Sequence, residues 1–171
     1  FILFSFWSIS YLARKALGKR GQDLDVSETI AVMGAGTIGA LAATYLDSFW
    51  FSAIEAEVYA FAAFFSFAMI WAMLKWDYNA DKPYGDRWLV LIALLTGLGV
   101  GVHLLHLLVI PGLAFIYYFR RYDFTWKGAI ITFLVGFGIL ATVLWGVLDY
   151  FVRIAARVDF LFVNSFGLPL A

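Results

Sequence analysis

The sequence has 171 residues, of which 64% are hydrophobic, 20% aromatic and 14% charged, and its mean hydropathy is +0.88. A soluble domain carries roughly 45–50% apolar residues, and a ~150-residue domain buries only ~70% of the surface its unfolded chain exposes. Twelve basic residues balance twelve acidic ones and cysteine is absent, which argues against nucleic-acid binding, disulfide scaffolds and thiolate metal sites. The composition indicates an all-α polytopic membrane protein.

Apolar runs of helical length alternate with polar segments along the chain. The runs cover 1–12, 29–46, 58–74, 88–119 and 128–148. The segments 14–28, 75–87 and 119–127 contain ten of the twelve Lys and Arg residues, whereas 47–57 holds three acids and no base. Basic loops stay in the cytoplasm, so the three basic segments are predicted on that side. The acidic segment and the amphipathic stretch 149–157 are predicted on the other side, followed by a loop at 164–169.

The run 88–119 must enter and leave on the same side for this topology to hold. A single helix of 32 residues would be ~48 Å long, too long for a hydrocarbon core of ~30 Å. Glycines and both histidines lie where a turn is needed, so we predict a short helical hairpin with arms 88–102 and 104–119. Irregular backbone at that depth requires surrounding protein or a water-filled cavity, which predicts a cavity open to the non-cytoplasmic side. The total is six membrane-embedded helices.

The segment 30–39 (IAVMGAGTIG) contains a literal GxGxxG motif. A dinucleotide site would require alternating strands and helices around it, but long apolar helices follow instead. The small residues are better explained as close helix-packing positions, Gly36 with Ala40 and Ala35 with Gly39. We therefore expect no nucleotide cofactor.

Glu55 and Glu57 lie at the outer mouth of the third helix. Acids near the membrane are costly unless they face water, a cation or a partner, and two nearby carboxylates can share a divalent cation or polarise a hydroxyl. The simpler alternative is a solvated interfacial loop within an aromatic belt.

The other polar candidates are two histidines and two arginines. His103 and His106 share a helix face near the predicted hairpin tip, where an imidazole can bind phosphate or metal or relay a proton; the alternative is a packed, hydrogen-bonded side chain. Arg153 and Arg157 are the only bases predicted on the outer side, and guanidinium suits phosphate. The alternative interpretation of the two arginines is an interfacial helix in which Asp149 and Arg153 form an exposed ion pair.

Four segments resemble a family of long bacterial inner-membrane proteins, first catalogued as a domain of unknown function, whose animal relatives are transmembrane protein O-mannosyltransferases. The segments are 47–60 (DSFWFSAIEAEVYA), 80–88 (ADKPYGDRW), 99–108 (GVGVHLLHLL) and 164–169 (NSFGLP). The family looks like a branch of the GT-C glycosyltransferases. The resemblance implies that residues 1–171 are a fragment of one transmembrane domain, inactive alone, without the family's first outer loop and C-terminal soluble region.

The resemblance also implies roles for particular residues. Glu55 and Glu57 match the family's second acidic motif and are expected to be supporting catalytic acids, with the main base before Phe1. His103 matches its Gly-Val-His motif, whereas His106 stands where Asn is expected. His103, Arg153 and Arg157 are expected to bind the donor phosphate, and a divalent cation is a further expected ligand.

The resemblance implies a glycosyltransferase that moves a sugar, mannose, from a polyprenyl-phosphate carrier to Ser or Thr of exported proteins on the periplasmic side of the bacterial inner membrane. The expected partners are this lipid-linked donor, an acceptor protein and the bilayer, without nucleic acid. Two other classes stay open: a transporter or channel lined by Glu55, Glu57 and His103, and a non-catalytic subunit of a membrane complex.

Overall fold

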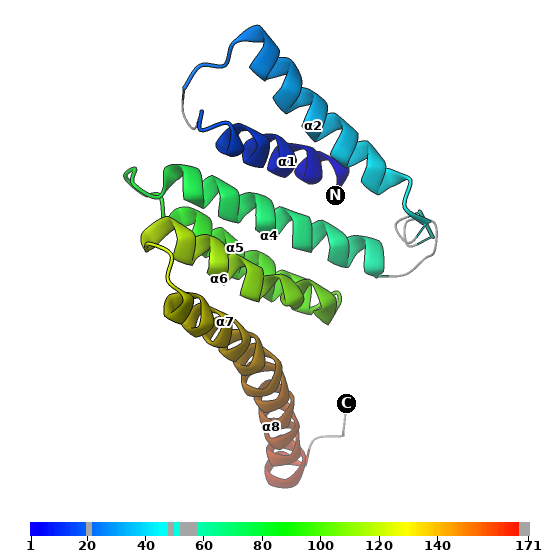
Figure 1. Ribbon diagram of the computed structural model, residues 1–171. Helices are drawn as coiled ribbons and strands as arrows, with labels where there is room; N and C mark the ends of the chain where they lie inside the picture. Colours follow the sequence, from blue (N-terminus) through cyan, green and yellow to red (C-terminus); the bar gives the residue numbers. More distant parts are fainter. Residues whose placement is uncertain (20–21, 48–49, 52–57, 168–171) are drawn as a thin grey trace.

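The computed structural model describes residues 1–19, 22–47, 50–51 and 58–167, which form helices and no strand (Figure 1). Four helical stretches in this part of the chain are long and apolar enough to cross a membrane, and α5 is a shorter apolar helix. The predicted all-α membrane architecture is therefore confirmed. The elements are α1 (Ile2–Ala16), α2 (Val26–Thr44), α4 (Tyr59–Asn79), α5 (Arg87–Val100), η1 (Leu104–Val109), α6 (Ile110–Arg121), α7 (Trp126–Ala141), η2 (Thr142–Asp149) and α8 (Tyr150–Phe166).

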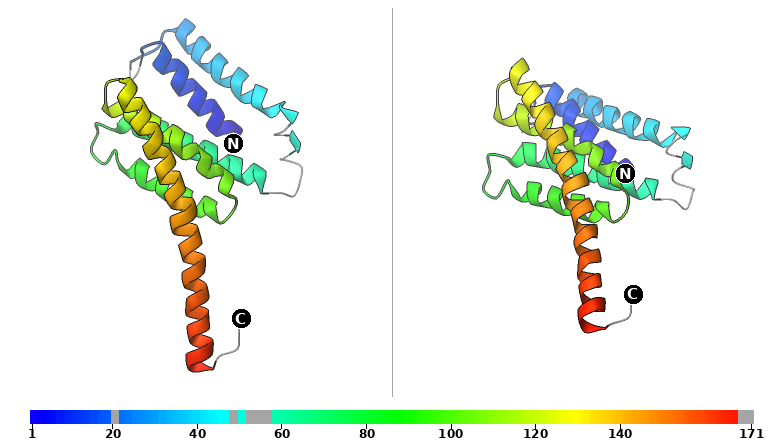
Figure 2. Two further views of the ribbon diagram at one scale, coloured as in Figure 1. Left: turned by 60° about the horizontal axis from the view of Figure 1, so that its bottom comes forward. Right: turned by 90° about the horizontal axis from the view of Figure 1, so that it is seen from below.

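The helices from α1 to α6 run back and forth, with α4 between α1 and the pair α5 and α6, so that alternate connections share an end (Figures 1 and 2). The connections after α1, α4 and α6 lie at one end, here called the basic end. Ion pairs show that these three helix ends lie close together, because Lys15 at the end of α1 and Arg120 at the end of α6 both contact Asp77 at the end of α4. The predicted placement of the three basic segments on one face is therefore correct.

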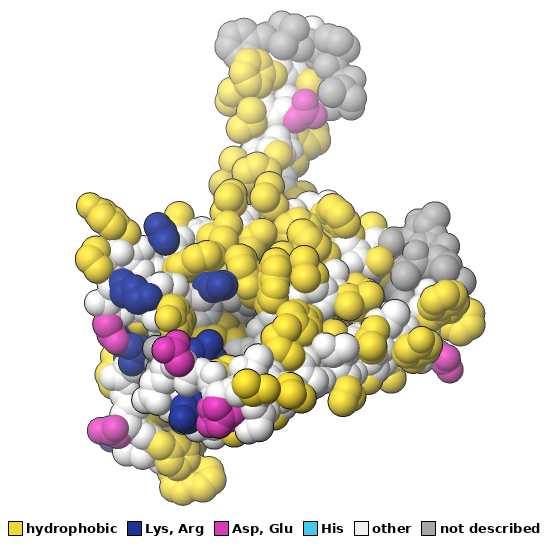
Figure 3. All heavy atoms as spheres, turned by 90° about the horizontal axis from the view of Figure 1, so that it is seen from above, with side chains coloured by type: hydrophobic (Ala, Val, Ile, Leu, Met, Phe, Trp, Pro, Cys, Tyr) yellow, Lys and Arg dark blue, Asp and Glu magenta, His cyan; other side chains and the backbone are white. Residues whose placement is uncertain are grey.

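The charged side chains follow the same division. On the face shown in Figure 3, most Lys, Arg, Asp and Glu side chains gather at the basic end, and hydrophobic side chains cover much of the remaining surface. Exposed apolar side chains on helices are typical of a lipid-facing surface. Side chains cap two of the helices that start at the basic end: Asp25 Oδ1 accepts the Glu28 N–H at 2.8 Å at the start of α2, and Thr125 Oγ1 accepts the Gly128 N–H at 3.0 Å at the start of α7.

Small residues let α2 approach α1 closely, as predicted for Gly36, Gly39 and Ala40, whereas Ala35, the other predicted packing position, is exposed. Gly36 and Ala40 are buried, and a Cβ on Gly36 would lie 2.1 Å from Ser10 Oγ and 3.0 Å from the Phe6 ring. A Cβ on Gly39 would lie 2.6 Å from Ile9 Cδ1. The GxGxxG segment is thus a helix-packing surface inside α2.

The helix α4 lies at the centre and packs against α1, α5, η1 and α6. Its buried residues Met69, Met73 and Trp76 form a core cluster with Leu113 of α6. The Trp76 ring also stacks on Tyr117 at 5.0 Å between centroids. The prediction that this helix ends at Leu74 was wrong: it continues to Asn79, because the Lys75 side chain is exposed and Asp77 has partners on neighbouring helices.

The predicted hairpin is present. The first arm ends at Val100 and the second begins at Leu104, with Gly101 and His103 in the turn between them. Both arms contact α4. The break occurs where the glycine-rich segment gives way to the histidines, as expected.

The last helical stretch differs from the prediction. Instead of a span ending at residue 148 followed by a separate tail, α7 continues through the π-helical η2 into α8, a total of 40 residues from Trp126 to Ser165. Residues 164–166, expected in a loop, belong to α8, and Gly167 with a left-handed φ of 64° caps the end of this helix. In Figure 1, α8 leaves the bundle and projects away from it.

Candidate functional site at the hairpin tip

His103 is held in the turn between the two arms by hydrogen bonds at three points. Its N–H donates to Gly99 O at 3.0 Å, its carbonyl faces His106 Nδ1 at 2.6 Å, and its own Nδ1 accepts the Leu105 N–H at 3.1 Å. Since Nδ1 is an acceptor, the proton of the neutral ring lies on Nε2. The half-buried His103 side chain therefore presents a hydrogen-bond donor.

The first turn of α4 lies beside this ring. The centroids of Tyr59 and His103 are 5.1 Å apart, with a tilt of 52° between the planes. Glu55 and Glu57 precede Tyr59 by four and two residues, but they lie outside the described residues. The structure thus brings the start of α4 to the hairpin tip, and the positions of the two acids stay predictions.

His106 is completely buried behind the tip. Its Nε2 lies 3.1 Å from the carbonyl oxygen of Thr96 on α5, and its ring lies 6.0 Å from that of Phe65 on α4. The absence of a side chain at Gly99 makes this possible, because a Cβ there would be 2.6 Å from His106 Nε2. His106 therefore joins both arms of the hairpin to α4.

An apolar groove of about 860 Å³ runs along the hairpin between α5, α6 and α7. The lining residues extend from Tyr122 and Gly128 near the basic end to Val143 near the start of η2. Thr96 is one of the residues of α5 that line the groove. A groove of this volume lies in the size range of ligand sites. A hollow beside the hairpin was expected, although the lining found is apolar, and an opening toward the non-cytoplasmic side stays a prediction.

The structure does not bring Arg153 and Arg157 to the histidines. Both are exposed on α8, which continues the helix of η2 and projects away from the bundle (Figure 1), and Arg153 forms an ion pair with Asp149 at 2.9 Å. Because both partners are largely exposed, this pair contributes little to stability. In the described residues, Arg153 and Arg157 therefore lie on an amphipathic helix with an exposed ion pair between Asp149 and Arg153, as in the alternative interpretation of the sequence.

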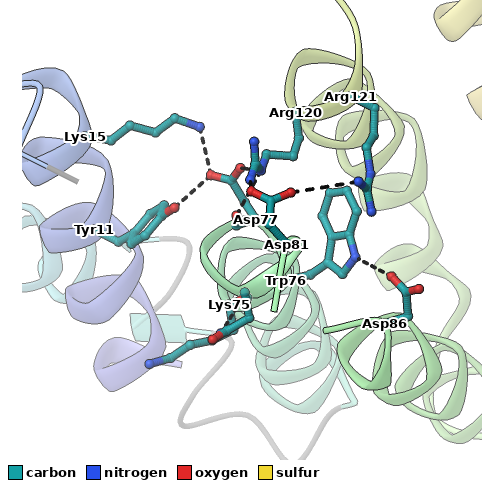
Figure 4. A network of polar contacts seen from close by, with 10 residues as sticks. Tyr11, Lys15, Lys75, Trp76, Asp77, Asp81, Asp86, Arg120 and Arg121 are labelled. Atoms are coloured by element: carbon teal, nitrogen blue, oxygen red, sulfur yellow. Dashed lines mark hydrogen bonds and ion pairs between the residues drawn. The ribbon is translucent and has the colours of Figure 1, made fainter. Parts of the chain in front are cut away.

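A second polar cluster, which the sequence analysis missed, lies at the basic end (Figure 4). Asp77 is fully buried; its Oδ2 accepts from Tyr11 Oη at 2.7 Å and from Lys15 Nζ at 2.8 Å. Arg120 Nε lies 3.4 Å from Asp77 Oδ1 and donates to its carbonyl oxygen at 3.2 Å. The same arginine also pairs with the exposed Asp81.

The contacts of Asp77 join α1, α4 and α6, so the cluster fixes the ends of three helices. It lies at the opposite end from His103. One feature of the sequence could have predicted this cluster. Asp77 directly follows Trp76, at a spacing that continues the apolar helix for one more turn.

No three His, Cys, Asp or Glu side chains converge as metal ligands within the described part of the chain. The two acids expected to share a cation are not in that part, so the metal expectation concerns Glu55 and Glu57 alone.

Comparison with known proteins gives one family. No curated protein and no solved structure matches the chain. The family model described as "Protein O-mannosyl-transferase TMEM260 N-terminal domain" matches residues 1–126, which include α1 to α6, the hairpin tip and both histidines. This match covers well over half of the 171 residues. The chain therefore belongs to the TMEM260 N-terminal domain family of protein O-mannosyltransferases.

Proposed function

We propose that this chain is part of a GT-C-type membrane glycosyltransferase that transfers mannose from a polyprenyl-phosphate carrier to Ser or Thr hydroxyls of exported proteins. We place it in the bacterial inner membrane with its active side in the periplasm. The observation that carries the proposal is family membership over residues 1–126. The hairpin tip and the apolar groove beside it are features such a reaction can use.

A lipid-linked donor has two chemically different parts, and the protein offers a surface for each. The isoprenoid chain is apolar, as is most of the lining of the groove between α5, α6 and α7. The phosphate is an anion, and His103 presents an Nε2–H donor at the tip. A donor aimed at developing negative charge lowers the barrier of group transfer.

In the proposed reaction, the acceptor hydroxyl oxygen attacks the anomeric carbon of the sugar. The bond between that carbon and the phosphate oxygen breaks, and polyprenyl phosphate leaves with the electron pair. A carboxylate takes the hydroxyl proton. We assign supporting roles to Glu57 and Glu55, either in aligning the hydroxyl or in holding a divalent cation.

The distribution of buried ionisable groups favours an enzyme over a transporter. Among the described residues, the fully buried ionisable side chains are Asp77 and His106, which lie at opposite ends of the bundle. Transport pathways use ionisable groups along the route, and α4 between these two ends is lined by aromatic and aliphatic residues instead.

The test is transfer of labelled mannose from polyprenyl phosphate to an acceptor protein by the full-length enzyme. Glu57→Gln keeps the size of the side chain and removes its charge, so we expect at least a tenfold loss, equal to ~1.4 kcal/mol of barrier. On a helical entry to α4, residues two positions apart lie on different faces, so we expect Glu55→Gln to cost less. Asp123→Asn, an exposed acid at the basic end, is the control and should transfer normally. Wild-type activity of Glu57→Gln would remove this acid from the site.

The outer arginines are tested in the same assay. We propose that Arg153 and Arg157 attract the carrier phosphate, because guanidinium binds phosphate well and both are exposed on α8. Arg157→Ala should raise the KM for the lipid donor several-fold, whereas Lys127→Ala at the basic end should not. An unchanged KM in both Arg153→Ala and Arg157→Ala would exclude them.

A further inference from the structure

We propose that His106 is a positioning residue for the hairpin-tip site, which fixes the backbone and the ring tautomer of His103 so that Nε2–H faces an anionic ligand. This inference rests on the proposed function for the identity of that ligand, a phosphate ester. It rests on contacts alone for the role of His106. Sequence reasoning gave His106 little weight because it departs from the expected family residue.

The first step is the constraint on His103. Its backbone is extended, with φ −166° and ψ 139°, and both of its backbone polar groups are engaged, the N–H with Gly99 O and the carbonyl oxygen with His106 Nδ1. This conformation allows Nδ1 to accept the Leu105 N–H. If the carbonyl were released, the peptide could rotate and the bond that sets the tautomer would be lost.

The second step is the chemistry of the His106 ring. Carbonyl oxygens only accept hydrogen bonds, so the 2.6 Å contact requires the proton on Nδ1. On the other side of the ring, Nε2 lies 3.1 Å from Thr96 O, so that the same ring also contacts the first arm of the hairpin. The ring of Phe65 on α4 lies 6.0 Å from that of His106, and Gly99 of α5 leaves room for the imidazole.

The third step connects the tip to the groove. Thr96 lines the groove between α5, α6 and α7, and its carbonyl oxygen is the second partner of His106. One buried ring thus joins the wall that would hold an isoprenoid chain to the residue that would contact the phosphate. His106 can therefore set the distance between the two parts of one ligand.

The experiment uses ¹⁵N-histidine NMR of the full-length protein, with the His103 signal identified by its loss in His103→Gln. In the wild type, we expect neutral His103 to be protonated at Nε2. His106→Phe retains a ring but no donor, and should convert the His103 signal to a mixture of tautomers. His106→Asn retains an N–H donor and should restore it. An unchanged His103 signal in His106→Phe would overturn the proposal.

A second variant guards against misfolding of the first. Gly99→Ala leaves both histidines in place but puts a Cβ 2.6 Å from His106 Nε2, and should shift the His103 signal as His106→Phe does. Gly97→Ala is the matched control on the same helix, because nothing lies within 4 Å of its added Cβ. Equal signals in both glycine variants would contradict the proposal.

A kinetic measurement separates this inference from the proposed function. In the mannose transfer assay, His106→Phe should raise the KM for the lipid donor about tenfold with a smaller change in kcat, and His106→Asn should recover most of it. If the wild type does not transfer mannose, the proposed function fails, and the NMR result still decides the role of His106.

Discussion

Asp77 is the residue whose replacement should most disturb the basic end. Its side chain is fully buried, whereas its cationic partners Lys15 and Arg120 are 43% and 21% exposed. Removing one member of a fully buried pair costs ~3–5 kcal/mol, but the exposed Lys15 can turn to water. We therefore expect Asp77→Asn to lower the free energy of unfolding by about 1–3 kcal/mol. Denaturation in detergent measures this loss.

The control for Asp77 is Asp81, an aspartate of the same cluster that is 68% exposed. Exposed ion pairs contribute about 0–1 kcal/mol, so Asp81→Asn should change stability little. Equal effects of the two substitutions would mean that burial of Asp77 contributes nothing to the cluster.

Asp25 should make the start of α2 sensitive to acid. The Glu28 N–H and then the Ser27 hydroxyl donate to its carboxylate and hold the pKa of Asp25 below its usual value. A lowered folded-state pKa stabilises the protein above the unfolded pKa, and the effect is lost as pH falls through the folded pKa. Amide exchange at Glu28 and Thr29 should therefore lose protection in acid. Asp25→Asn, which caps without titrating here, should lose less; an identical pH dependence would contradict this role.

At the scale of single residues, the sequence predicted His103 near the hairpin turn but predicted neither the contacts of His106 nor those of Asp77. His103 lies at a break in an apolar run, which a sequence shows. The value of His106 depends on two carbonyl oxygens and on the space above Gly99, and that of Asp77 depends on helices that are distant along the chain. Such contacts arise only after packing.

The contact between α6 and α7 depends on a glycine. A Cβ on Gly136 would lie 2.9 Å from the backbone Cα of Pro111 and 3.3 Å from Ala114 Cβ, so Gly136→Ala must push the helices apart. We expect a loss of about 1–3 kcal/mol in stability from this overpacking. Gly138, two residues along the same helix, has nothing within 4 Å, and Gly138→Ala should stabilise by about 0.5–1 kcal/mol.

Thermal denaturation of the two glycine variants checks this prediction through the sign of the shift. If the melting temperatures of both variants shift in the same direction, helix propensity, which is the same for both substitutions, outweighs the contact with Pro111.

At the scale of elements, the apolar runs predicted which helices exist but not where two of them end. A run of hydrophobic residues dictates a membrane helix because its backbone groups must be satisfied internally. The ends of α4 and α8 were misplaced because polar residues were taken as loops. In α4, Asp77 is compatible with the helix because Lys15 and Arg120 neutralise it. In α8, helix formation needs no such partners, and the chain continues until Gly167 ends it.

At the scale of the whole molecule, the alternation of charge predicted the order in which the helices run. Each connection at the basic end contains Lys or Arg, and the contacts between Arg120 and both Asp77 and Asp81 place two of these connections together. What the charge pattern could not predict was the direction of α8, because lateral packing of a helix depends on the shape of its neighbours.

The topology can be tested across the membrane because the chain has no cysteine of its own. We expect Lys82→Cys and Asp123→Cys, both exposed at the basic end, to be protected equally from an impermeant thiol reagent added outside intact cells, since basic loops stay in the cytoplasm. Tyr45→Cys, at the opposite end of α2 and 84% exposed, should react. Permeabilised cells should label all three, which shows that each thiol is accessible. Labelling of only one basic-end position in intact cells would contradict the hairpin, because the two arms must return the chain to the side from which it entered.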